Sequence, residues 1–426
     1  MNASELRGAA HGLSQAQPSA VGSAVGAVAG SPNGALVSGL KAKSTVLFVD
    51  QSGQLGGAEF SLLPLAQAFA ARGAVLLLSD GPFRERLASL GVNVSVASEA
   101  RVSGISKEAL RFRWLFALPA IVRQVRAIAE AAKRYDVLFL NTQKALVLGA
   151  LGKPLHRRPV IWHLHDIMSA DHFGSMQLLA VKFIARHLVD HVVANSRASA
   201  QSLASLTGIP LAAIPVVHNG IDTHAFANVD GADLAALRRR LGLPERAWLA
   251  GLFGRLAPWK GQHIAIAALP RLPDVHLMLV GAALFGEDDY AQRLRRQALR
   301  LGVADRVHFA GFRDDMAAWM KAMDVILHTS TEPEPFGRVI IEGMAAGRPV
   351  IAAGAGGVKE IVRHRRNGWL VAPGDLNSLV DAIETLRAAP ELAQRLAEQA
   401  LIDTQRYFSL DVYVEQMTRA IGCVSP

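Results

Sequence analysis

Two cations and two acids in the second half of the sequence suit a long ligand with a diphosphate at its centre. Arg255 and Lys260 lie in GRLAPWKG, and Glu334 and Glu342 begin and end EPFGRVIIE. An arginine fork and a compact lysine charge can neutralise a diphosphate. Along a helix the acids would lie up to about 12 Å apart, beyond the roughly 5 to 9.5 Å of a glycosidase carboxyl pair. We therefore expect them to bind hydroxyl groups at opposite ends of the ligand, although solvated surface side chains would also explain each pair.

The peptide between the two acids adds backbone donors. A helix is expected to begin around Phe336 or Gly337, and Gly261 is expected to open the helix after Lys260. N–H groups at a helix start bind phosphate, and a glycine lets the phosphate approach closely. Phe336 and Gly337 are therefore candidate ligand-binding residues through their backbone.

The segment PVIWHLHD places two histidines in the first half of the chain. His163 and His165 share one face of a predicted strand, and Asp166 follows at its carboxyl end. Two histidines and an acid suggest a metal site. No further ligand motif follows, however, and an acid that starts a helix is common. We predict no metal site here or elsewhere, since no convincing DxD motif is present.

Repeated units of strand and helix position these residues. The first begins at Thr45–Asp50 (TVLFVD), and similar units follow until the pattern pauses after Asp222 and resumes at Trp248. Apolar strands interleaved with helices predict a parallel sheet covered on both faces. The expected fold is α/β, with two doubly wound Rossmann-like domains facing across a cleft. Ligands of such sheets bind beyond the carboxyl ends of the strands.

These patterns divide the chain into four parts. Residues 1–43 are expected to form a flexible tail, and residues 44–225 the first Rossmann-like domain. Residues 226–400 are expected to form the second Rossmann-like domain. Residues 401–426 are expected to form a C-terminal helix that packs back on the first domain.

Composition excludes several protein classes. The chain has 426 residues, 51% of them hydrophobic, so it can bury a large core. Cys423 is the only cysteine, which excludes an intrachain disulfide and favours a reducing cytoplasm. The net charge of +9 suits phosphate-bearing ligands or anionic membranes. Basic residues are spread through both halves with few tyrosines, so we expect no nucleic-acid partner. Residues 8–40 are too weakly apolar for a membrane span.

Three motifs together carry a family resemblance. The segments GRLAPWKG, EPFGRVIIE and AAGRPVIAAGAGGVKEIV resemble the nucleotide-binding half of GT-B retaining glycosyltransferases, particularly family 4. The resemblance covers about Thr45 to Ile421. It implies the GT-B fold and hexosyl transfer from a nucleotide-sugar, a UDP- or GDP-sugar above all. By this resemblance residues 44–225 would be the acceptor-side domain and residues 226–400 the nucleotide-sugar-binding domain. We expect no metal or other cofactor, because Arg255, Lys260 and the helix start can stabilise the charge on the leaving diphosphate.

The resemblance also implies roles for the four charged residues named first. Arg255 and Lys260 would hold the donor diphosphate, Glu342 the ribose hydroxyls, and Glu334 hydroxyls of the donor sugar. Glu332 departs from the family pattern, because it gives EPEPFG two acids before Phe-Gly. The spacing favours Glu334 as the acid that meets the sugar.

Other positions match the family less specifically. Gly56 and Gly57 resemble its glycine loop near the donor phosphates, where an ordinary turn is the competing explanation. Gly311 and Phe312 would lie near the nucleobase, and His165 would be an active-site histidine near the reacting sugar. By this resemblance His165 and Glu334 are the catalytic candidates; the donor-binding candidates are Gly56, Gly57, Arg255, Lys260, Gly311, Phe312, Phe336, Gly337 and Glu342.

The acceptor is predicted only by class. We expect a saccharide or a lipid-linked molecule, as in polysaccharide or glycolipid biosynthesis. Residues Ile105 to Tyr135 mix basic and aromatic side chains and could rest on the inner face of an anionic membrane. An ordinary helical pair interrupted by Pro119 is the competing interpretation.

Alternatives to transfer remain open. A GT-B-like epimerase or phosphorylase, or a nucleotide-sugar-binding protein without activity, would share the fold. A nicotinamide dehydrogenase is disfavoured, because GxGxxG is missing from the first turn. No residue presents itself as an enzyme nucleophile, so we expect same-face attack assisted by the leaving phosphate.

Overall fold

The computed structural model describes residues 44–97, 114–229, 233–283 and 286–424. The predicted tail at residues 1–43 and part of the basic segment after Ile105 lie outside these residues. The described residues belong to one compact unit. No helix within them is long and apolar enough to cross a bilayer.

A six-stranded parallel sheet forms the centre of the first half, in the order β3-β2-β1-β4-β5-β6. Its strands are β1 (Val46–Asp50), β2 (Gly73–Leu77), β3 (Val94–Val96), β4 (Val137–Leu140), β5 (Val160–Leu164) and β6 (His191–Ala194). The helices around it are α2 (Gly57–Ala68), α3 (Pro82–Ser89), α4 (Trp114–Ala132), α5 (Gln143–Leu151), α6 (Lys153–His156), α7 (Ser175–His187) and α8 (Arg197–Thr207).

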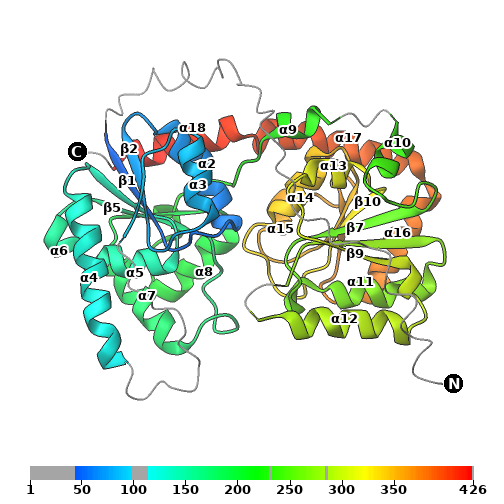
Figure 1. Ribbon diagram of the computed structural model, residues 1–426, viewed down its shortest axis with the longest axis horizontal. Helices are drawn as coiled ribbons and strands as arrows, with labels where there is room; N and C mark the ends of the chain where they lie inside the picture. Colours follow the sequence, from blue (N-terminus) through cyan, green and yellow to red (C-terminus); the bar gives the residue numbers. More distant parts are fainter. Residues whose placement is uncertain (1–43, 98–113, 230–232, 284–285, 425–426) are drawn as a thin grey trace, which may run out of the picture. The chain divides into compact units, whose positions relative to one another are not determined.

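Both faces of this sheet are buried, which explains its continuous apolar strands. Along β1, Phe48 packs in one hydrophobic cluster with Leu62 of α2. Its neighbour Leu47 packs in another cluster with Ile128 of α4 and Leu146 of α5. Helices accordingly lie on both sides of the sheet (Figure 1). This is the doubly wound arrangement that the sequence predicted.

A second six-stranded parallel sheet has the order β12-β11-β10-β7-β8-β9. Its strands are β7 (Trp248–Phe253), β8 (Val275–Val280), β9 (Val307–Gly311), β10 (Val325–His328), β11 (Val350–Ala353) and β12 (Trp369–Val371). Its helices are α9 (Thr223–Ala227), α10 (Leu234–Arg240), α11 (Gln262–Ala268), α12 (Asp288–Arg300), α13 (Met316–Lys321), α14 (Arg338–Ala345), α15 (Val358–Ile361), α16 (Leu376–Ala388) and α17 (Pro390–Tyr407).

The last helix, α18 (Leu410–Gly422), packs against the first half of the chain. Tyr413, Met417 and Ile421 join the cluster that contains Phe48. Ser409 caps the helix by accepting a hydrogen bond from the backbone N–H of Val412. The chain therefore returns to the first sheet after completing the second.

Three local features differ from the sequence-based expectation. Strand β3 is only three residues long, and its middle residue Ser95 is polar, so its pattern is too weak to predict. Pro119 does not interrupt α4, which runs through it as one helix. A proline this close to the start of a helix removes few backbone hydrogen bonds. One helix was expected within residues 401–426, but α17 continues to Tyr407 and α18 begins at Leu410.

Candidate functional site

Lys260 and Glu334 form an ion pair at the carboxyl edge of the second sheet. Nζ of Lys260 donates to both carboxylate oxygens of Glu334 at 2.8 Å. Lys260 ends the short 3-10 helix η4 (Pro258–Lys260) after β7, and Glu334 lies in the loop after β10. Strands β7 and β10 are paired and parallel, so both loops leave the same edge. The two residues meet because of this topology, although they lie far apart in the sequence.

Two further side chains stabilise the negative charge of Glu334. Ser330 Oγ lies 3.0 Å and His328 Nε2 lies 3.3 Å from its Oε2. Burial of the carboxyl would raise its pKa, but the Lys260 charge and the hydrogen bonds from His328 and Lys260 hold the pKa of Glu334 well below its usual value. Glu334 is therefore an ionised hydrogen-bond acceptor at neutral pH.

A glycine turn after β11 holds the Glu334 loop. The backbone N–H of Gly357 donates to the carbonyl oxygen of Glu334 at 2.9 Å. Gly356 adopts φ +60°, and a Cβ there would lie 2.2 Å from the same carbonyl. Only glycine tolerates both that conformation and that approach. The AGAGG part of the third family motif thus positions the first acid of the second motif.

Glu342 lies on α14 and pairs with an arginine that the sequence analysis did not single out. Its Oε1 lies 3.1 Å from Arg338 Nη2. The same guanidinium donates to the carbonyl oxygen of Gly220 at 3.2 Å and lies over the ring of Phe60. Arginine four residues before an acid on one helix face is a recognisable spacing. That spacing could have drawn attention to Arg338.

The two acids do not share one helix. Glu334 precedes α14, which begins at Arg338 with Gly337 as its N-cap residue. A helix start near Phe336 or Gly337 was expected, and it lies one residue further on. The Phe336 side chain is 2% exposed and packs against Phe408. Only the backbone of Phe336 can therefore serve a ligand.

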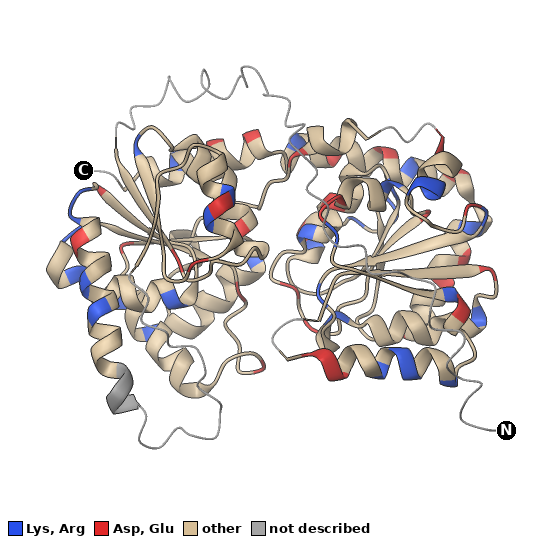
Figure 2. Ribbon diagram, viewed as in Figure 1, with Lys and Arg blue, Asp and Glu red and all other residues tan. Residues whose placement is uncertain are grey.

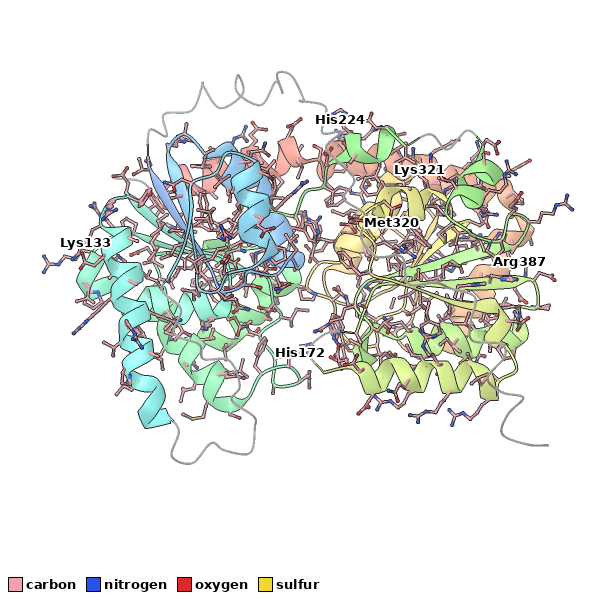
Figure 3. All side chains as sticks on the ribbon, viewed as in Figure 1. Lys133, His172, His224, Met320, Lys321 and Arg387 are labelled. Atoms are coloured by element: carbon pink, nitrogen blue, oxygen red, sulfur yellow. The ribbon has the colours of Figure 1, made fainter. Side chains whose placement is uncertain are left out.

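Glu332, the extra acid, has a different partner from Glu334. Its Oε2 lies 3.3 Å from Nδ1 of His172. His172 belongs to the loop before α7 (Figure 3). The structure thus separates the two acids of EPEPFG: Glu334 contacts Lys260, and Glu332 contacts a histidine of the first half.

The other predicted donor-binding residues of the second half also follow strands of this sheet. Arg255 lies in the loop after β7, with Nε 3.5 Å from Glu287 Oε2. Gly311 ends β9, and the side chain of Phe312 after it is 73% exposed. Loops after β7, β9 and β10 therefore bring Arg255, Lys260, Gly311, Phe312 and Glu334 to one edge of the sheet, and α14, which follows the last of these loops, carries Glu342.

The predicted residues of the first half lie at the carboxyl edge of their own sheet. Gly56 is the N-cap of α2 and Gly57 its first residue. His165 follows β5, and its ring centroid lies 3.9 Å from that of His163. Burial and the Arg338 charge lower the pKa of His165 to about 3, so this side chain is neutral. Among the described residues, no group of three His, Cys, Asp or Glu side chains could hold a metal ion.

Comparisons with known proteins agree with this architecture. Residues 55–225 match the family described as Glycosyltransferase Family 4, and residues 234–402 match Glycosyl transferases group 1. A crystal structure of Anabaena Alr3699/HepE in complex with UDP-glucose is 37% identical, with a TM-score of 0.81 over 89% of this chain and 100% of that chain. The chain belongs to the group 1 glycosyltransferases. The predicted GT-B fold of this glycosyltransferase is confirmed.

Curated relatives match shorter parts of this glycosyltransferase. The D-inositol 3-phosphate glycosyltransferase of Streptomyces bingchenggensis is 33% identical over 245 residues, 54% of this chain and 53% of that protein. The lipopolysaccharide core biosynthesis glycosyltransferase LpsE of Rhizobium meliloti is 37% identical over 169 residues, 40% of this chain and 48% of that protein. The glycosyltransferase spans about half the length of these curated relatives.

Proposed function

We propose that this group 1 glycosyltransferase moves a sugar from a nucleoside diphosphate donor to a saccharide or lipid-linked acceptor, with retention of anomeric configuration and without a metal. The observation that carries the proposal is the Lys260–Glu334 pair at 2.8 Å. An ammonium group has three N–H donors, and two of them serve Glu334. The third is left for a phosphate oxygen beside the acid that binds the sugar.

Each further role follows from the position of a side chain. Arg255 and Lys260 both lie in the segment that follows strand β7, and together they bind the diphosphate. Glu342 binds Arg338 through Oε1, so its second oxygen is available for ribose hydroxyls. Phe312, which is largely exposed after β9, stacks on the nucleobase. Gly56 lets the phosphates approach the start of α2 because it has no side chain, and the backbone N–H groups of Gly57, Phe336 and Gly337 serve them at the starts of α2 and α14.

The transfer step needs charge stabilisation more than a nucleophile. The acceptor oxygen bonds to the anomeric carbon while the bond from that carbon to the phosphate oxygen breaks. The acceptor proton passes to the leaving phosphate. Arg255 and Lys260 stabilise the charge that develops on the diphosphate. Glu334 is a weak nucleophile because Lys260, Ser330 and His328 surround its carboxylate, so we expect retention to proceed by same-face attack and not through a glycosyl-enzyme intermediate.

A UDP-sugar is the first donor to test. The Anabaena protein, 37% identical, has structures with UDP, with UDP-glucose, and with UDP and glucose. We expect UDP-glucose to raise the melting temperature of this protein more than GDP- or ADP-glucose, since a ligand of the native state stabilises it. Equal shifts with all three, or none, would contradict a uridine donor. Proton NMR of the anomeric signal in the first product distinguishes retention from inversion.

An exposed apolar stripe supports contact with a membrane that carries the acceptor. Met176, Leu179 and Phe183 of α7 are 78%, 59% and 57% exposed, and their spacing places them on one helix face. Arg123 and Arg126 also lie on α4, whose basic positions are blue in Figure 2, and α4 contacts α5. We include peripheral binding to an anionic bilayer in the proposal.

Vesicle flotation tests the membrane part. The protein should float with vesicles that contain phosphatidylglycerol and not with phosphatidylcholine alone. Replacement of Met176, Leu179 and Phe183 by serine should abolish flotation and leave donor binding unchanged. A variant that still floats, or a wild-type protein that never does, refutes membrane contact without touching the donor assignment.

A further inference from the structure

Two carboxyl groups lie in contact in the core of the first half. Asp50 ends β1 and is 0% exposed, and Glu59 on α2 is 7% exposed. Their side chains are hydrogen-bonded to each other. Two buried carboxyl groups that are hydrogen-bonded to each other cannot both be ionised, so one of them holds a proton.

Glu59 is the protonated member of the pair. Burial first, and the Asp50 charge second, raise the pKa of Glu59 to about 8. Asp50 accepts further hydrogen bonds, from the backbone N–H of Ser52 at 2.9 Å and from Asn141. These bonds favour its ionised form. At neutral pH, Glu59 is thus a neutral O–H donor to the Asp50 carboxylate.

Gly56 makes room for this arrangement. A Cβ at Gly56 would lie 2.8 Å from Oε2 of Glu59. The backbone N–H of Gly56 also donates to the Glu59 carboxyl group. The glycine at position 56 of the GGAE turn therefore allows the Glu59 side chain to fold back over the start of α2.

Asn141 connects the acid pair to His165. Its Nδ2 donates to Asp50 Oδ2 at 2.7 Å and to the carbonyl oxygen of Ala58 at 3.1 Å. Both partners are acceptors, so the amide can have only one orientation, with Oδ1 on the other side. That oxygen lies 3.1 Å from Nε2 of His165.

The orientation of Asn141 determines the tautomer of His165. An amide oxygen only accepts, so Nε2 of the neutral imidazole must carry its hydrogen. Nδ1 then has a lone pair, and within the described part of the chain no hydrogen bond to it is found. We propose that Glu59, Asp50 and Asn141 are positioning residues that hold His165 as the Nε2–H tautomer and present Nδ1 as an acceptor to a hydroxyl group of the reacting sugars.

The proposal deepens the transferase function and rests on it for the identity of the hydroxyl group. The tautomer itself does not depend on that function. A neutral donor on Glu59 is what the arrangement needs, because a second negative charge would repel Asp50. Glutamine supplies such a donor with the same shape, whereas leucine does not.

The decisive measurement is the nitrogen NMR spectrum of the histidine side chains in the full-length protein. His165→Gln assigns the signals of His165 by difference. We expect wild-type His165 to show a protonated Nε2 and a bare Nδ1, and Asn141→Leu to show a mixture of both tautomers. Asn141→Ser provides the same comparison if Asn141→Leu does not fold.

Kinetics supply the second readout. With UDP-glucose as donor, Asn141→Leu and Glu59→Leu should lower kcat about 10- to 100-fold, as is usual for groups that orient a functional histidine, with little change in donor KM. Glu59→Gln should retain most of the kcat that Glu59→Leu loses. Ser61→Ala is the matched control: Ser61 is equally buried on α2 but donates only to the Gly57 carbonyl oxygen. It should keep wild-type kcat.

Two results would overturn the proposal. One is an unchanged His165 spectrum in the Asn141 variants. The other is a Glu59→Gln variant as impaired as Glu59→Leu, which would show that glutamine cannot substitute as a neutral donor. If no nucleotide-sugar supports transfer, the proposed function fails, while the NMR spectra still decide the tautomer.

Discussion

Nζ of Lys260 lies 2.8 Å from each carboxylate oxygen of Glu334, so the cation proposed for the donor phosphate and the acid proposed for the donor sugar form a single ion pair. Their side chains are only 20% and 12% exposed. The pair connects the two chemical halves of the proposed donor. Removal of one member should therefore affect the other.

Lys260→Ala should weaken binding of the nucleotide-sugar about 10- to 100-fold, the range expected for the loss of a charged hydrogen bond. It should also raise the pKa of Glu334, which would lose its main compensating charge. Titration calorimetry measures the affinity. Lys153→Ala is the matched control, because Lys153 pairs with Asp190 at the same 2.8 Å away from the site. Equal losses in both variants would count against the phosphate role of Lys260.

Glu342→Gln should reduce discrimination between ribose and deoxyribose in the donor. Wild-type protein should bind UDP-glucose more tightly than its 2′-deoxy analogue, because Glu342 accepts hydrogen bonds from the ribose hydroxyls. In the variant the two affinities should converge to within a few-fold. Calorimetry with both ligands and both proteins completes a cycle. If the variant prefers UDP-glucose over the 2′-deoxy analogue as strongly as wild type does, Glu342 does not bind the ribose hydroxyls.

Phe312→Ala should weaken nucleotide binding, whereas Phe336→Ala should destabilise the fold. Phe312 is 73% exposed, and its loss should weaken nucleotide binding by roughly 1 to 3 kcal/mol without changing thermal stability. Phe336 is 2% exposed, and its truncation should lower the free energy of unfolding by about 3 to 5 kcal/mol. Calorimetry and denaturation measure the two. Destabilisation by Phe312→Ala would instead assign that ring a packing role.

The stability of the protein should depend on pH through Glu59. The pKa of this carboxyl group is raised from 4.5 to about 8 on folding. The folded state therefore keeps a proton that the unfolded state has released, and stability falls as pH rises between these values. Glu59→Gln replaces the titrating carboxyl group with an amide that does not ionise. Urea denaturation at several pH values should show wild type losing stability relative to Glu59→Gln from about pH 5 to pH 8.

Glu59 and Asp50 are hydrogen-bonded and share this proton, so the quantity to compare is the difference in stability between wild type and Glu59→Gln. Titrating groups away from this pair contribute equally to both proteins and cancel in the difference. A difference in the free energy of unfolding that stays constant across this range would mean that Glu59 is ionised in the folded protein.

The sequence predicted the two sheets well because nearly every strand is buried on both faces and therefore apolar throughout. Strand β3 was missed because Val94–Val96 is short and has a polar centre. The convergence of Lys260 and Glu334 was foreseen because parallel strands end at one edge and because family motifs contain both residues. Contacts of this kind depend on topology, which the order of strands and helices largely determines.

The arrangement around His165 could not be predicted in the same way. Asp50 and Asn141 are 91 residues apart and meet only because β1 and β4 are neighbours in register. A buried acid, a glutamate after two glycines and an asparagine at a strand end look ordinary one by one. The hydrogen bonds that connect them depend on side-chain directions within the packed core, which the sequence does not show. The partners of Arg338 likewise come from distant parts of the chain.

The return of α18 to the first sheet limits how the protein can be divided. Tyr413 and Met417 are 1% and 0% exposed within a core otherwise built from the first half of the chain. A fragment that stops near residue 225 would uncover the apolar surface beneath them and should aggregate when expressed alone. The first half should be obtained in isolation only when the last helix is supplied with it, either fused by a linker or added as a synthetic peptide.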